Sequence, residues 1–271
     1  MTAHPAAASI APRRRQRADR LTLIAPIVLA AVAVTVWEVI VRAKLVAEVF
    51  LPAPSSLAAR FVTELTQGPL WRHTWVTLTE ALVGTALAVA IAVPLGYLIA
   101  RVRWADYALT PYVTASQAVP AVAIAPLLAL WVGYGLAPIA ILCAIVAFFP
   151  MLITTVLGVR SLPADVLEAA RLDGASRWQS LWWVEAPIAL PSVLAGVRAG
   201  AALSVTGAVV GEFTMGGRGL GMLLTLFRDA NDTEGLFATL LMLVALAVGL
   251  FVALRILEAL ARTRFRNRST K

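Results

Sequence analysis

Six long apolar stretches, separated by short polar segments, limit what this chain can fold into. They cover roughly residues 21–42, 77–100, 107–131, 137–158, 189–210 and 236–257. A helix of about 20 apolar residues crosses the hydrocarbon core of a bilayer. With 60% hydrophobic and 14% charged residues, the chain is also more apolar than soluble domains. The pattern predicts an all-α membrane protein with six transmembrane helices.

The basic residues are concentrated on one side of these stretches. Segments 1–20 and 259–271 are basic, and most of the 23 Lys and Arg residues lie there or in loops on the same side. Because cytoplasmic segments carry this excess, both termini are expected in the cytoplasm, with the membrane domain over 21–258. The start lacks a small-residue cleavage site, which favours an uncleaved first helix. The pI of about 10.7 thus reflects topology, and no nucleic-acid partner is expected.

Residues 57–65 show the spacing of an amphipathic helix. Their apolar side chains recur every three to four positions, with Arg60 and Glu64 on the opposite face. Such a helix is expected to lie at the outer membrane surface. Gly68 follows as a helix breaker.

Residues 161–191 form a long segment that is too polar to span a membrane, and they predict two short helices. Ser161 can cap the first helix, and Pro163 suits its opening turn. Asp165 lies where the helix dipole favours an anion. Gly174 then permits the chain to turn, as glycine does just past a helix end.

The second short helix has its own start and stop signals. Ser176 and Gln179 have the spacing of a capping box, in which each side chain bonds to the other's backbone N–H. Pro187 and Pro191 are expected to end this helix before the next span begins.

The third apolar stretch, 107–131, contains Pro111, Pro120 and Pro126 together with the polar Gln117. Three prolines argue against a straight helix. Broken backbone is tolerated at membrane depth where protein or water satisfies it, and such breaks often mark transport pathways. A kinked helix that serves packing alone remains an equal alternative.

Several kinds of enzyme site find no support in the sequence. The glycine-rich stretch 211–221 is not preceded by a strand or followed by Gly-Lys-Ser/Thr, so it is not expected to bind phosphate or ATP. His4 and His73 are too few and too far apart for a metal site. Cys143 lies in an apolar run and is expected to pack, without a disulfide inside the chain. No catalytic constellation is recognisable.

A secondary transporter or channel and a membrane-embedded enzyme are two alternative functions for such a membrane protein. A secondary transporter or channel working alone would require ionisable residues deep in several spans, and Arg198 is the one good candidate. A membrane-embedded enzyme would require a catalytic cluster. Both are therefore disfavoured.

The segment 161–191 carries a family resemblance. Glu168-Ala169-Ala170, three further residues and Gly174 resemble the EAA loop of permease subunits of bacterial ABC importers, although Val184-Glu185-Ala186-Pro187 keeps that loop's final Ile-x-Leu-Pro only approximately. Leu51-Pro52-Ala53-Pro54 before an amphipathic helix is similar to the nitrate/sulfonate/taurine branch. The resemblance covers nearly the whole chain after residue 20.

The resemblance implies the type I permease fold with a cytoplasmic EAA coupling loop, in a multi-pass protein of the bacterial inner membrane. It also implies a homodimer, two ATPase subunits that bind the ATP, and an external binding protein that delivers a small solute. That solute would be of the nitrate/sulfonate/taurine or the aromatic/pyrimidine kind. The residues that would contact the ATPase are Glu168, Ala169, Ala170, Gly174 and Pro187.

The solute pathway is expected along the third and fifth spans, between two copies of the chain. It would be lined by Gln117, Pro120, Ser204, Thr206 and Glu212. Arg198 has two open roles. It helps an anionic solute through, or it fixes the fifth span near Glu185 and the loop, which its place in the inner half of the span favours.

Overall fold

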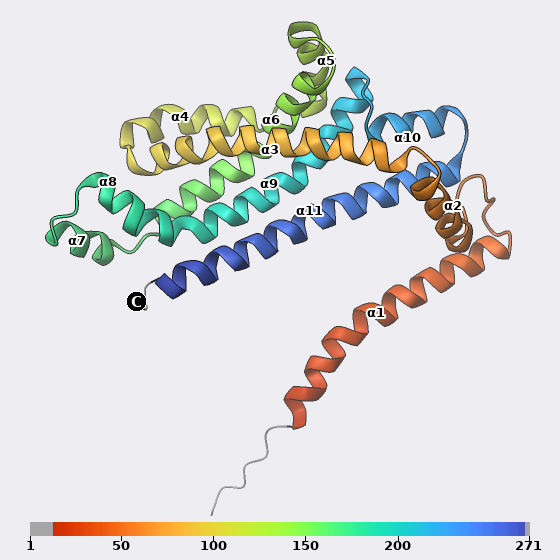
Figure 1. Cartoon of the computed structure of the whole chain (residues 1–271), viewed down its shortest axis with the longest axis horizontal. Coiled ribbons are helices and arrows are strands. Elements are labelled where there is room, and N and C mark those ends of the chain that lie inside the picture. Colours follow the sequence, from red (N-terminus) through yellow and green to blue (C-terminus); the bar gives the residue numbers. More distant parts are fainter. Residues whose placement is uncertain (1–12, 269–271) are drawn as a thin grey trace, which may run out of the picture. The chain divides into compact units, whose positions relative to one another are not determined.

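This computed structural model describes residues 13–268, with side chains described for residues 25–259. Its α-helices are α1 (Arg13–Arg42), α2 (Pro54–Thr66), α3 (Leu70–Arg101), α4 (Arg103–Ser116), α5 (Ala121–Val132), α6 (Leu136–Arg160), α7 (Ala164–Leu172), α8 (Arg177–Ser180), α9 (Ala186–Met215), α10 (Leu220–Asp229) and α11 (Thr233–Arg268) (Figure 1). A π-helical segment, Leu181–Glu185, joins α8 to α9. Of the two predicted basic ends, residues 1–12 and 269–271 lie outside the described residues.

Within the described part of the chain, five helices are long and apolar enough to cross a bilayer, and the number is six if the bent pair α4 and α5 forms one span. These helices fall on the six apolar stretches of the sequence. The predicted all-α membrane fold is thereby confirmed, with six spans if α4 and α5 are counted as one.

The third predicted span is broken. Helices α4 and α5 are bent by 97° at residues 117–120. Pro120 has no N–H to continue the helix and its ring would clash with the carbonyl four residues earlier. The backbone at Pro120 is accordingly extended, with ψ 124°. Pro111 and Pro126 lie inside α4 and α5, so the break occurs at one proline of the three.

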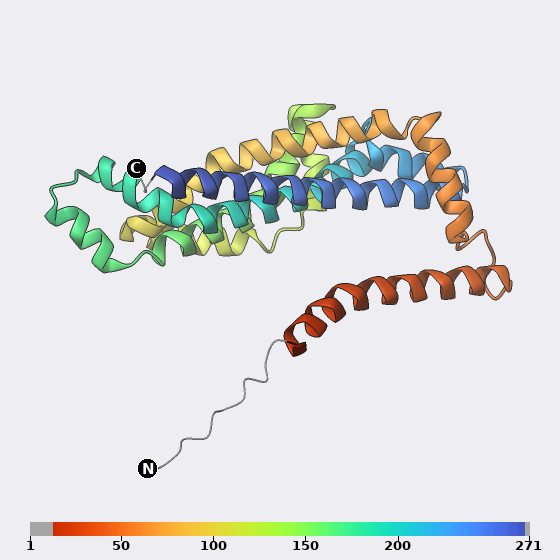
Figure 2. The same cartoon turned by 60° about the horizontal axis from the view of Figure 1, so that its bottom comes forward.

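Helices α3, α6, α9 and α11 run side by side in residues 61–271 (Figures 1 and 2). Two glycines allow helices α3, α6 and α9 to approach one another closely. A Cβ at Gly84 of α3 would lie 2.8 Å from the Ala140 carbonyl oxygen of α6, and one at Gly200 of α9 would lie 2.8 Å from the Ala147 carbonyl oxygen. Small residues at helix contacts are typical of membrane bundles, where packing rather than the hydrophobic effect drives association.

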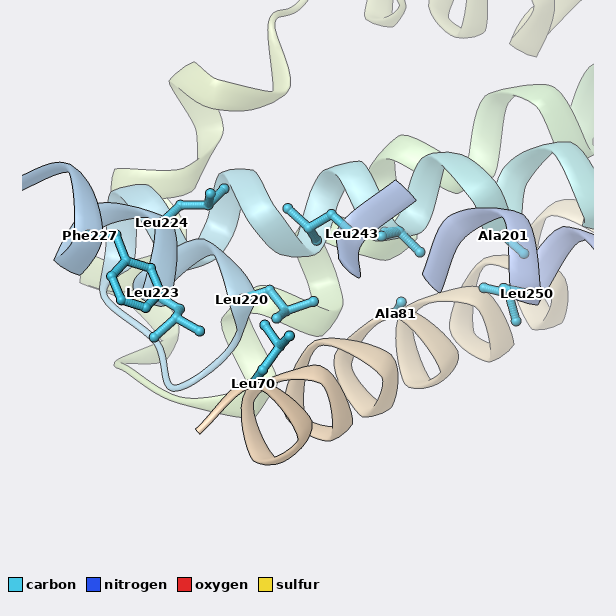
Figure 3. Close-up of a cluster of buried hydrophobic side chains, with 10 residues drawn as sticks. Leu70, Ala81, Ala201, Leu220, Leu223, Leu224, Phe227, Leu243 and Leu250 are labelled. Atoms are coloured by element: carbon cyan, nitrogen blue, oxygen red, sulfur yellow. The ribbon is translucent and has the colours of Figure 1, made fainter. Parts of the chain in front are cut away.

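A buried apolar cluster holds α10 against the end of the bundle (Figure 3). It combines residues of four helices: Leu70 and Ala81 of α3, Ala201 and Val205 of α9, Leu220, Leu223, Leu224 and Phe227 of α10, and Leu243 and Leu250 of α11. This cluster fixes the position of the turn that precedes α10.

Of the described residues, 13–60 belong to a compact unit of their own. Within it, Glu38 near the end of α1 accepts hydrogen bonds from Arg42 Nε (2.5 Å) and from Ser55 Oγ (2.7 Å). The amphipathic helix predicted next is confirmed as α2, but its polar face is not as expected. Glu64 is buried, and its Oε2 lies where it would collide with a Cβ at Gly68.

Candidate functional sites at the two ends of the bundle

Helix α7 begins after Pro163, not after a serine cap. The prediction that Ser161 caps α7 is wrong, because Ser161 ends α6 instead and its Oγ donates to the Gly158 carbonyl oxygen (3.0 Å). Pro163 takes the N-cap position with an extended backbone, and Asp165 lies in the first turn as predicted. Leu162, which lies between Ser161 and Pro163, is buried and anchors the start of the segment.

The turn between α7 and α8 is stabilised by a glycine conformation and by capping hydrogen bonds. Gly174 has φ +79°, a conformation that favours glycine. Its N–H donates to the Arg171 carbonyl oxygen (3.0 Å), and the Ala175 N–H donates to that of Ala170 (3.0 Å). These two bonds together form a Schellman motif. The predicted capping box of Ser176 and Gln179 follows directly, with N···O distances of 2.8 and 3.3 Å.

The residues predicted to contact an ATPase lie on the outside of this turn. Glu168, Ala169 and Gly174 are exposed, and Ala170 is half-buried. Helix α7 reaches the bundle through Leu167, which packs on a small cluster that includes Tyr97 of α3. The helices α7 and α8 therefore form an outward-facing knob at one end of the bundle (Figure 1).

Pro187 and Pro191 do not end the second short helix, contrary to prediction. The helical conformation continues from α8 through the π-helical segment into α9, and the helix over Arg177–Met215 is unbroken. Pro187 lies in the first turn of α9, directly after the π-helical segment. The π-helical turn carries the chain up to this proline without an interruption. Such turns are often found at functional sites.

The π-helical segment ends at Glu185, whose carboxyl group ties the loop to α3. Tyr97 Oη donates to Glu185 Oε2 (3.0 Å), and Arg101 pairs with the same oxygen at 2.6 Å. Ser180 Oγ donates to Glu185 Oε1 (3.2 Å). The buried carboxylate thus has donors on both oxygens, one of them a guanidinium group. It links α3, α8 and the start of α9 in a single polar contact.

Arg198 has a different partner from the one expected. Its Nη1 pairs with Glu258 of α11 at 2.5 Å, and its guanidinium lies 5.1 Å from the centre of the Phe251 ring. Glu185 is occupied by Arg101 instead. Arg198 therefore joins α9 to α11 rather than to the loop.

A second buried carboxyl group, Glu212 of α9, lies at the opposite end of the bundle. Thr77 Oγ1 donates to Glu212 Oε1 (2.7 Å), and the Gly221 N–H donates to Oε2. Thr77 Oγ1 in turn accepts from the Leu220 N–H (2.8 Å). Glu212 thereby fixes the turn before α10 against α3.

This arrangement explains the glycine-rich stretch. A Cβ at Gly219 would collide with Glu212 and Thr77, and one at Gly221 would lie 2.8 Å from Glu212 Oε2. The glycines let the backbone wrap around a buried carboxyl group and do not form a phosphate-binding loop.

Sequence reasoning missed Glu80, a second buried carboxyl group near Glu212. Glu80 comes from α3 and is only 3% exposed. A signal was present, since Glu80 is an acidic residue within a long apolar run and such residues are functional candidates.

The structure does not gather the five predicted pathway residues into one site. Glu212 and Ser204 are buried, and Ser204 Oγ donates to the Ala81 carbonyl oxygen (2.8 Å). Gln117 and Pro120 lie exposed at the break between α4 and α5, and Thr206 is exposed on α9. Their roles remain predictions.

The chain is similar to several known proteins. The family described as binding-protein-dependent transport system inner membrane component matches residues 92–266. The riboflavin transport system permease protein of Chloroflexus aurantiacus is 44% identical over 210 residues, which is 78% of each chain. The formylaminopyrimidine transport permease protein of Halalkalibacterium halodurans is 30% identical, over 82% of this chain and 88% of that protein.

The chain is also similar to a second transport permease and to a solved transporter structure. The taurine transport system permease protein of Escherichia coli is 29% identical, over 84% of this chain and 85% of that protein. The solved structure of an inward-facing methionine ABC transporter matches with a TM-score of 0.64 and 20% identity. It covers 70% of this chain and 94% of the matched chain, which indicates a shared fold.

Proposed function

Because this chain belongs to the family of binding-protein-dependent transport system inner membrane components, and so is a permease subunit of an ABC importer, we propose that its loop 161–191 receives a separate ATPase. The observation that carries this proposal is the knob of α7 and α8. Its turn has a Schellman motif at the end of α7 and a capping box at the start of α8. It carries Glu168 and Ala169 on its exposed side and touches the bundle through Leu167.

The loop is suited to transmitting force. Its Schellman motif and capping box hold the two helices in one shape, while the exposed Ala169 and half-buried Ala170 permit close approach of a partner. Glu168 would pair with basic groups of the ATPase, and Pro187 would begin the span that moves. Glu185 connects the knob to α3 through Arg101 and Tyr97. Closure of an ATPase pair would therefore tilt α3 and α9 together.

The assembly that we propose contains two copies of this chain, two ATPase subunits and an external binding protein. ATP would be bound by the ATPase, and this chain would supply neither a catalytic residue nor a metal site. Both termini and the loop 161–191 would face the cytoplasm, which the distribution of basic residues supports.

For the pathway we propose the helix break at residues 117–120 together with the fifth span. Gln117 and Pro120 are exposed there and would offer polar groups to a solute between two copies of the chain. Thr206 is also exposed, whereas Ser204 and Glu212 would shape the pathway from within the bundle.

For the solute we favour the aromatic or pyrimidine kind over the nitrate, sulfonate and taurine kind. The relative with 44% identity is named for riboflavin and another for formylaminopyrimidine. The relative named for taurine is 29% identical.

The coupling role is tested by Gly174→Val, with Gly133→Val as the matched control. Both glycines have positive φ and open space around them, so a side chain strains each backbone by about 1–2 kcal/mol. We expect Gly174→Val to lower both the recovery of the co-expressed ATPase with the permease and solute uptake, while Gly133→Val leaves recovery unchanged. Undiminished recovery and uptake for Gly174→Val would contradict the proposal.

A further inference from the structure

Three exposed tryptophans form an aromatic patch where α8 continues into the π-helical segment. Trp178, Trp182 and Trp183 are 69%, 58% and 81% exposed. The rings of Trp178 and Trp182 meet edge to face, with their centres 5.8 Å apart. Together with Gln179, the three tryptophans line a cavity of about 380 Å³. Contiguous apolar surface of this kind marks a contact with a membrane or with another protein.

Other exposed aromatic side chains lie at the same end of the bundle as this tryptophan patch. Trp104 and Tyr107 at the start of α4 are 74% and 80% exposed. Asp106 between them pairs at 2.6 Å with Arg160, the last residue of α6 before the loop 161–191. The start of α4 therefore lies at the end of the bundle that carries the knob of α7 and α8 (Figure 1).

The α10 end of the bundle also carries exposed aromatic groups. Trp75 of α3 is 61% exposed and lies one half-turn before Thr77, which contacts the turn before α10. From Trp75 to Arg101, which pairs with Glu185 beside the patch, α3 advances about 39 Å at 1.5 Å per residue. A bilayer with its headgroup regions is about 40–45 Å thick, and Trp is enriched at both of its interfaces. This spacing puts the tryptophan patch at the level of the headgroups on the knob's side of the membrane.

The charges of the knob divide between its two helices. Residues 164–173, which include α7, contain three acidic residues and one arginine, whereas residues 174–184 contain Arg177 and no acidic residue. Arg177 is exposed next to the patch, and Asp165 and Glu168 are exposed on α7. Anionic headgroups attract an exposed arginine and repel acidic groups. The division therefore favours an arrangement in which α8 faces the membrane surface and α7 faces away from it.

We propose that Trp178, Trp182 and Trp183, together with Arg177, bind the headgroup region of an anionic phospholipid. The indole rings pack on the glycerol and upper acyl carbons and donate their N–H groups to ester oxygens, while Arg177 donates to the phosphate. This lipid contact goes beyond the proposed ATPase contact, because it gives the knob a second partner on its other side. It holds α8 at the membrane surface, so that displacement of α7 by an ATPase is passed on to α9.

Photo-crosslinking of the full-length chain identifies the molecule that covers the patch. Benzoylphenylalanine, which reacts with nearby C–H bonds on illumination, replaces Trp182 in membranes that contain the co-expressed ATPase, and mass spectrometry identifies the adducts. We expect phospholipid adducts at position 182 and none with the ATPase. Leu172 at the end of α7 is 88% exposed, and the same probe in its place is the matched control, for which ATPase adducts are expected.

Two further measurements test the residues of the site, each at equal recovery of the co-expressed ATPase. In nanodiscs of phosphatidylcholine with a minor share of phosphatidylglycerol, phosphatidylglycerol should exceed its share of the bilayer several-fold among the adducts at position 182. Arg177→Gln should remove this enrichment. Trp178→Ser combined with Trp183→Ser should lower the lipid adduct several-fold. Trp104→Ser, which changes a tryptophan at the same end but outside the cavity, should leave it unchanged.

An ATPase adduct at position 182 would assign the patch to the ATPase and overturn the lipid site, while the ATPase contact of the loop would stand. Lipid adducts that are as abundant at position 172 as at position 182 would also overturn the proposal. The same holds for a phosphatidylglycerol share equal to that of the bilayer, and for a loss with Trp104→Ser as large as that with the two patch substitutions.

Discussion

The two ends of the bundle each contain a buried glutamate, but the two carboxyl groups have different neighbours. Glu185, beside the knob of α7 and α8, receives the Arg101 guanidinium and two hydroxyl groups. Glu212, beside α10, receives one hydroxyl and one backbone N–H, and Glu80, another buried carboxyl group, lies near it. Glu185 therefore has an opposite charge and a donor on each oxygen. Glu212 accepts from neutral donors.

The different bonding partners of Glu185 and Glu212 indicate different roles for the two ends of the bundle. A buried charge with an opposite charge and hydrogen bonds on both oxygens holds its elements in one arrangement, and removing its partner is strongly unfavourable. The Glu185 end therefore serves as a rigid joint between the loop and α3, whereas Glu212 and Thr77 hold the turn before α10 with uncharged donors.

The largest stability effect is expected at the joint. Arg101→Gln leaves Glu185 as a buried, uncompensated charge and should lower the free energy of unfolding by about 3 kcal/mol. The measurement is SDS-induced unfolding in mixed micelles. Arg160→Gln is the control, since its pair with Asp106 is more exposed and should be worth less than about 1 kcal/mol. Similar losses for the two variants would remove the special status of the joint.

A smaller effect is expected at the other end. Thr77→Val keeps the side-chain shape but removes a hydroxyl that accepts from Leu220 and donates to Glu212. The loss should be about 2 kcal/mol in the same unfolding assay, because two buried groups lose a partner. Thr214→Val, which removes an exposed hydroxyl bonded within α9, should change stability little. A neutral Thr77→Val would show that the turn before α10 is held by packing alone.

The smallest stability effect is expected between the two ends, at the helix break. Gln117 is exposed, so Gln117→Leu should change the free energy of unfolding by less than about 0.5 kcal/mol. Solute uptake should nevertheless fall several-fold if this residue lines the pathway. Ser116→Ala is the neighbouring control and should leave uptake unchanged. Normal uptake by Gln117→Leu across solute concentrations would remove this residue from the pathway.

Much of the fold followed from local sequence patterns. The apolar stretches placed the spans, Pro120 supplied the break in the third, and Gly174 with Ser176 and Gln179 specified the turn of the loop. These features depend on residues close together in the chain, where periodicity, proline and capping chemistry act directly.

The predictions that were wrong concern elements and contacts that depend on other parts of the folded chain. Ser161 suits an N-cap, but the longer helix α6 extends to it first. Pro187 signals a helix start as well as a stop, and the π-helical segment allows the helix to continue. The pairing of Arg198 with Glu258 and the proximity of Glu80 to Glu212 join separate helices, so they depend on a three-dimensional register that no local pattern contains.

The central claim, that the loop 161–191 is the site of ATPase contact, is tested most directly by cysteine cross-linking. Ala169→Cys, in a Cys143→Ala background, places one thiol on the exposed side of α7, and Ala230→Cys places one at the exposed end of α10. Membranes containing the co-expressed ATPase are treated with a short bifunctional thiol reagent. We predict a permease–ATPase product for position 169 and none for position 230. A product at position 230, or its absence at position 169 when the ATPase co-purifies, would contradict the account.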